Sequence, residues 1–134
     1  MHGRIFLRLG GLLAAVAVAM GALGAHLLKE KLSAEQFANF ETALRYQMYH
    51  AIALVLVGLA AGRNSAGRKG ANWLAAAGWL FVAGILLFSG GLLGWIFTAV
   101  KPFVHVVPIG GTLWILAWLC FAIAPLGKSP TAGS

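Results

Sequence analysis

Seven side chains that can carry charge, donate hydrogen bonds or ligate an ion are set in or beside long apolar stretches of this sequence. They are His26, Glu41, Arg45, Tyr46, Gln47, His50 and Ser89. On a helix that advances about 100° per residue, Glu41, Arg45 and His50 fall within about half of the circumference. A charge that faces lipid is costly, so we expect this stripe to face protein. Glu41 and Arg45, four residues apart, can pair near the membrane interface and, with Tyr46, anchor the helix there.

The two histidines are open to three interpretations. His26 precedes Lys29 by three residues, and His50 follows Arg45 by five. If both charged residues mark one membrane boundary, a rise of about 1.5 Å per residue places the imidazoles about 4 Å and about 7 Å below it, at nearly the same level. Two such imidazoles could ligate a haem or a metal, form a proton or ligand site, or hydrogen-bond a neighbouring helix. No carboxylate lies in any apolar stretch to complete a metal site, so we expect structural hydrogen bonding, with no metal and no cofactor.

The composition of the chain is that of a membrane protein. Of its 134 residues, 60% are hydrophobic and 10% are charged, and the mean hydropathy is +0.87. A soluble core of this size could not hide so much apolar surface. Ten Lys and Arg residues oppose three Glu, which gives a formal charge of +7. The basic residues stand singly or in small groups beside apolar runs, so we expect attraction to anionic lipid and not to nucleic acid.

Charge-free intervals predict four membrane spans in a single domain, an all-α integral membrane four-helix bundle with both termini on the same side. The expected spans are about 8–28, 45–62, 72–94 and 108–125. Ser33 and Gln36 have the spacing of a capping box, so the second helix is expected to begin at about Ala34. Its first turns, about 34–44, would form an interfacial segment. We start the fourth helix at Pro108, because proline suits the first helical turn.

The distribution of basic residues predicts the orientation. The side that holds the termini would carry six of them: Arg4, Arg8, Arg63, Arg68, Lys69 and Lys128. The other side would carry Lys29, Lys31 and Lys101, joined by Arg45 if the boundary falls below it. By the positive-inside rule we expect both termini in the cytoplasm and the chain in the inner (plasma) membrane of the cell.

Glycines and a proline are expected to permit close packing beside the polar residues. They are Gly21, Gly24, Gly90, Gly91, Pro108, Gly110 and Gly111. Counting about twenty residues from Asn72 brings Ser89 to the outer level of the membrane, where the fourth helix would begin. We therefore expect the polar residues to converge at the outer end of the bundle, with His50 facing His26, Ser89 and the turn at Pro108.

Four short motifs resemble, in order and spacing, the domain-of-unknown-function 423 family. They are GALGAH at 21–26, YQMYH at 46–50, LFSGG at 87–91 and PIGG at 108–111. Members of that family are small bacterial inner-membrane proteins similar to the mitochondrial transmembrane protein 256. The chain departs from the family pattern at Leu23, at 91–93 and at Val107, which removes hydroxyl groups from the expected cluster. The resemblance implies a four-helix membrane fold and carries no established activity, substrate or catalytic residue.

Two classes of function remain once enzymes are set aside. The sequence has no phosphate-binding loop, no pair of acids and no Ser or Cys nucleophile with a placed His and acid, so we expect no catalytic residue. The first class is a structural or accessory membrane component that binds lipid or a membrane partner, as a homo-oligomer or within a larger membrane complex. The alternative is an oligomeric transporter or channel for a small solute or protons that uses the polar cluster. Size favours the first, because four short helices enclose little space.

Overall fold

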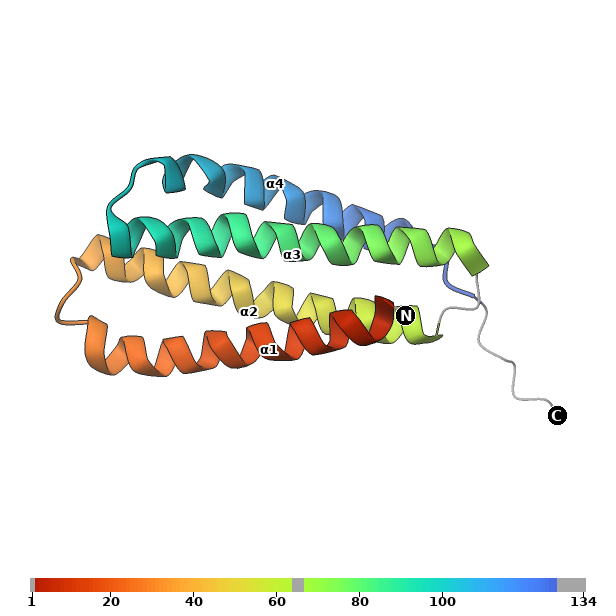
Figure 1. Ribbon diagram of the computed structural model, residues 1–134, viewed down its shortest axis with the longest axis horizontal. Coiled ribbons are helices and arrows are strands. Elements are labelled where there is room, and N and C mark those ends of the chain that lie inside the picture. The colour runs from red at the N-terminus through yellow and green to blue at the C-terminus, as the bar shows by residue number, and fades with distance from the viewer. Residues whose placement is uncertain (1, 64–66, 128–134) are drawn as a thin grey trace.

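The computed structural model describes residues 2–63 and 67–127, and these fold almost entirely into helices. The four long ones are α1 (His2–Leu23), α2 (Ala34–Arg63), α3 (Gly67–Thr98) and α4 (Pro102–Ile123), shown in Figure 1. A short π-helical segment, η1 (Gly24–Leu28), continues α1. All four helices are long and apolar enough to cross a membrane. The predicted all-α, four-helix fold is confirmed, and no strand occurs in the two described stretches.

Helices that follow one another along the chain pack side by side. α1 packs on α2, α2 on α3 and α3 on α4, and each pair is antiparallel (Figure 1). The start of α1, the end of α2, the start of α3 and the end of α4 therefore lie at one end of the bundle, which we call the termini end. The opposite end, where residues 29–33 and 99–101 connect the helices, is the hairpin end.

The start of α2 agrees with the capping box. The backbone N–H of Gln36 donates to Ser33 Oγ at 3.1 Å, and the backbone N–H of Ser33 donates to Gln36 Oε1 at 3.0 Å. These reciprocal bonds satisfy two donors at the helix start. From Ala34 the helix continues without a break to Arg63, so residues 34–44 are the first turns of α2 itself.

The start of α4 differs from the expectation. The helix begins at Pro102 and not at Pro108, which lies inside it. A proline does occupy the first turn of α4, but it is Pro102, the earlier of the two. Inside the helix, Pro108 has no N–H to donate to the carbonyl of Val104, so one intrahelical bond is missing there.

The third helix is also longer than expected. It runs to Thr98, beyond the expected end near 94, and only residues 99–101 connect it to α4. Gly90, Gly91 and Gly94 do not end the helix. A Cβ on Gly91 would lie 2.9 Å from the carbonyl oxygen of Phe103, so this glycine lets α4 approach α3 closely.

One apolar core cluster draws side chains from all four helices, among them Phe6, Leu54, Phe81 and Trp114. Glycines provide the room for its largest rings. A Cβ on Gly78 would overlap the ring of Phe6, and a Cβ on Gly84 would overlap the indole of Trp114. Because lipid is as apolar as these side chains, close packing holds such a bundle together more than the exclusion of water does.

Candidate functional site

The centre of the site is the stacked pair of His50 on α2 and Trp114 on α4. Their ring centroids lie 3.7 Å apart, and their planes differ by 7°. His50 is 6% exposed, and Phe81 and Trp118 lie on its other sides, with centroids at 5.7 Å and 6.3 Å. The imidazole is therefore enclosed by aromatic rings.

One nitrogen of this imidazole is bonded to its own helix. Nδ1 of His50 lies 2.7 Å from the carbonyl oxygen of Tyr46, one turn earlier on α2. Because a carbonyl can only accept, Nδ1 carries the proton in this bond. The bond orients the ring against Trp114, whose indole also lies parallel to the ring of Tyr46 at 5.9 Å.

Three side chains each tie one pair of neighbouring helices by donating to a backbone carbonyl. Gln47 Nε2 on α2 donates to Leu13 on α1 at 2.9 Å. Ser89 Oγ on α3 donates to Ala43 on α2 at 2.8 Å. Trp114 Nε1 on α4 donates to Phe81 on α3 at 3.3 Å. We call these the three interhelical bonds.

Gln47 and His50 do not lie at one end of the bundle, where the site was expected. Gln47 and His50 lie in the middle turns of α2, far from the hairpin end. The expectation counted depth from Arg45, which itself lies about three turns inside α2. The polar residues therefore gather in the middle of the bundle and not at its outer end.

His26 does not belong to this cluster. It is exposed in η1, and the neighbouring Gly24 packs on the ring of Phe40. Phe40 and His50 are ten positions apart on α2, which is about 15 Å along the helix. The prediction that His26 and His50 lie at one level and face each other is wrong.

Glu41 and Arg45 also lie away from the centre. Both are exposed and line a groove of about 230 Å³ between α1 and α2 at the hairpin end, together with Phe37 and Gly21. Within the described range 2–63 the structure gives no ion pair between them, so their expected pairing is not formed. Of the seven predicted polar residues, Tyr46, Gln47 and His50 lie together on α2, and Ser89 reaches the same helix one turn earlier, at Ala43.

The predicted packing glycines fall into two groups. Gly24, Gly91 and Gly110 lie where helices touch, and a Cβ on any of them would be too close to a neighbour. Gly21, Gly90 and Gly111 have room, since a Cβ there would meet its nearest atom at 3.8, 3.9 and 3.9 Å. Spacing along the sequence does not distinguish the two groups, because only the packed structure shows which face meets a neighbour.

Sequence reasoning missed the partners that complete the site. Trp114 stacks on the histidine and ties α4 to α3, and Phe81 supplies both a ring and the accepting carbonyl. One signal could have found Trp114: an indole N–H inside an apolar span needs an acceptor. Gly84, which makes room for the indole, carried no such signal.

The polar side chains at the bundle centre contact neighbouring helices. In the described parts of the chain no group of three or more His, Cys, Asp or Glu residues is placed to hold a metal ion. The hydrogen-bonding atoms of Gln47, Ser89 and Trp114 point at backbone carbonyls. Each of these three side chains thus uses a donor to hold a neighbouring helix.

Comparison with known proteins finds relatives along nearly the whole chain. The family described as Protein of unknown function (DUF423) matches residues 20–111. A UPF0382 membrane protein of Staphylococcus aureus (strain bovine RF122 / ET3-1) is 42% identical over 121 residues, which cover 90% of this chain and 94% of the relative. A UPF0382 membrane protein of Staphylococcus epidermidis (strain ATCC 12228 / FDA PCI 1200) is 43% identical over 123 residues, which cover 92% and 96%. No solved structure matches.

Proposed function

The chain belongs to the DUF423 family of membrane proteins, and on that premise we propose that it is a non-enzymatic structural or accessory component of the membrane. Its resemblance to that family in four motifs is confirmed by the match. With four helices apolar enough to span a bilayer, it is a multi-pass membrane protein. In this proposal the interior holds the fold, and the outer surface binds lipid or a membrane partner.

The three interhelical bonds carry the proposal. Each neighbouring pair of helices has one polar side chain that donates to a carbonyl of the other helix. Hydrogen bonds between membrane helices contribute about 0.6 kcal/mol on average and up to about 1.7 kcal/mol. Polar residues that each serve one helix pair are what a packing role requires, whereas a substrate site needs polar atoms that face a cavity.

The transport alternative has less support. A path through the middle of one copy would have to pass His50, whose ring is stacked on Trp114 and packed near Phe81. The outer helices favour the surface role, because α1 and α4 bury much less of their apolar length than α2 does. Apolar faces of this kind contact lipid or another membrane protein.

The proposed orientation places the termini end in the cytoplasm, in the plasma membrane. In the described residues the termini end carries five basic side chains: Arg4, Arg8, Arg63, Arg68 and Lys69. The hairpin end carries four, Lys29, Lys31, Arg45 and Lys101, together with the three Glu of the chain. The excess of Lys and Arg supports this orientation under the positive-inside rule.

A comparison of two hydroxyl deletions tests the packing role. Ser89→Ala removes the bond from α3 to α2, so the free energy of unfolding in detergent should fall by about 0.6 to 1.7 kcal/mol. Thr112→Val is the matched control, because the Thr112 hydroxyl is exposed and donates at 3.0 Å to Pro108 on its own helix. A ligand or transport site predicts the opposite for Ser89→Ala, since polar groups kept for function often reduce stability. Unchanged or increased stability of Ser89→Ala would overturn the proposal.

A further inference from the structure

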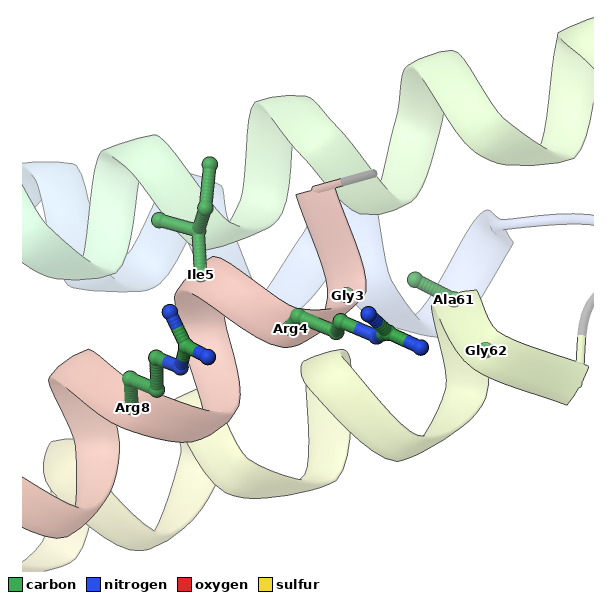
Figure 2. Close-up of a pocket in the computed structure, with 6 residues that line it drawn as sticks. All are labelled: Gly3, Arg4, Ile5, Arg8, Ala61 and Gly62. Carbon is green, nitrogen blue, oxygen red and sulfur yellow. The ribbon is translucent and has the colours of Figure 1, made fainter.

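A groove lies between α1 and α2 at the termini end, and two arginines border it. Its volume is about 620 Å³, and its lining residues are Gly3, Arg4, Ile5, Arg8, Ala61 and Gly62. Figure 2 shows both arginine side chains on the face of α1 that borders the groove, with the guanidinium of Arg4 extended toward Ala61 and Gly62. Both arginines are exposed.

Among residues 2–63 and 67–127, no acidic side chain lies at this end of the bundle. All three Glu lie between residues 30 and 41, and the structure places that segment at the hairpin end. The termini end adds further positive charge through Arg63, Arg68 and Lys69. Arg4 and Arg8 are four residues apart on one helix face, where like charges repel one another. An anion from outside the chain would remove this repulsion.

The position and lining of the groove indicate which anion fits. Arg8 directly precedes the charge-free run that ends at Lys29, so the groove lies at the level where a bilayer presents its headgroups. Guanidinium groups match phosphate oxygens in a bidentate geometry. Ile5 and Ala61 add apolar surface beside the charges, which suits the glycerol and upper acyl region of a lipid.

We propose that this groove binds the phosphodiester of an anionic phospholipid, with Arg4 and Arg8 as the phosphate-binding residues. The proposal rests on the proposed function, because it names the lipid class that the surface of this membrane component would take. A headgroup that carries its own cation would repel the second arginine, so a headgroup such as glycerol is preferred over choline.

The test is lipid binding to the full chain in neutral detergent, measured by native mass spectrometry. Dioleoyl phosphatidylglycerol should bind more tightly than dioleoyl phosphatidylcholine. Arg4→Gln with Arg8→Gln should weaken phosphatidylglycerol binding about 30-fold, since each basic residue beside an anionic lipid contributes about fivefold. Arg4→Lys with Arg8→Lys keeps the charges but loses the bidentate geometry, so its binding should lie between that of the unmodified chain and that of the double Arg→Gln variant.

Two matched variants separate the groove from general positive charge. Arg68→Gln with Lys69→Gln removes two charges at the same end but outside the groove lining, so binding should change little. Gly62→Leu keeps every charge and fills the groove; a Cβ there would meet no atom within 4 Å, so the fold should tolerate it. It should weaken binding as the double Arg→Gln variant does. Equal losses in the two charge-removing pairs, or full binding by Gly62→Leu, would overturn the site.

Soluble glycerol phosphate distinguishes a lipid from a free phosphate. It should displace bound phosphatidylglycerol poorly, because it lacks the apolar part that Ile5 and Ala61 contact. Equally strong binding of glycerol phosphate would overturn the lipid assignment. The Ser89→Ala measurement is independent of this groove, so failure of the lipid site and failure of the packing role would be seen separately.

Discussion

Two adjacent glycines on α4 should respond in opposite directions to the same substitution. A Cβ on Gly110 would lie 2.5 Å from the backbone nitrogen of Phe88, 2.9 Å from its Cβ and 3.0 Å from the carbonyl oxygen of Gly84. These atoms belong to α3 or are fixed to its backbone, so they cannot rotate away. A Cβ on Gly111 would meet only Phe88 Cδ2, at 3.9 Å, which is an ordinary contact.

The magnitude follows from two opposing terms. Replacing Gly by Ala inside a helix stabilises the helix by about 0.5 to 1 kcal/mol, and this term applies to both positions. Overpacking a close contact costs about 1 to 3 kcal/mol and applies only to Gly110→Ala. Gly111→Ala should therefore be neutral or stabilising. Because the helix term cancels, Gly110→Ala should be less stable than Gly111→Ala by about 1 to 3 kcal/mol.

The assay is unfolding by sodium dodecyl sulfate in mixed micelles, followed by far-ultraviolet circular dichroism. Each variant is compared with the unmodified chain at one protein concentration, so that any self-association affects all samples alike. The pair should differ in the midpoint of unfolding, with Gly111→Ala at or above the unmodified chain. Two results would contradict this reasoning: equal midpoints for the two variants, or a lower midpoint for Gly111→Ala than for Gly110→Ala. Either would show that Gly110 does not pack closely against α3.

Four further outcomes are expected. In a double-mutant cycle of His50→Ala and Trp114→Phe, thermal melts should show a coupling of about 0.5 to 3 kcal/mol, since the two rings touch; additive losses would contradict the stack. His26→Ala should change stability by less than about 0.5 kcal/mol, because the side chain is exposed, and a larger loss would place it in a network. The orientation can be tested by cysteine labelling in a variant in which Cys120 is replaced by alanine. Lys31→Cys should react with an impermeant thiol reagent added outside intact cells, and Ser65→Cys should not. The reverse pattern would invert the proposed orientation. Purified protein should carry no haem, so a Soret band lost in His50→Ala would revive the cofactor interpretation.

Features that depend on the local sequence could be predicted well. The lengths of the apolar runs indicated four helices, because a helix must be long enough to cross a bilayer. Ser33 and Gln36 located the start of α2, since a capping box uses only neighbours in the chain. The choice between Pro102 and Pro108 failed because both prolines suit a first turn and only the packed helix distinguishes them.

Features that depend on packing could not be predicted. The depth of His50 was counted from Arg45, but a charged residue on a long helix can stay exposed and need not mark the membrane boundary. The membership of Ser89 and Gln47 in the site was expected, yet their partners, the carbonyls of Ala43 and Leu13, could not be named. Any helix carbonyl can accept a second hydrogen bond, so the sequence does not say which one does.

The three interhelical bonds fix the register of the bundle together with the close contacts at its glycines. Sliding one helix past its neighbour would break the close contacts that glycines allow, such as that of Gly110 with Phe88, and it would also break these bonds. A slide of one helical turn, about 5.4 Å, would separate Gln47 from Leu13 or Ser89 from Ala43 and leave a polar group unpaired among apolar ones. One bond per helix pair therefore fixes all three neighbouring pairs. Because the donors of Gln47, Ser89 and Trp114 are used to hold the register, we propose binding at charged groups near the surface, of which Arg4 and Arg8 border a groove large enough to hold a headgroup.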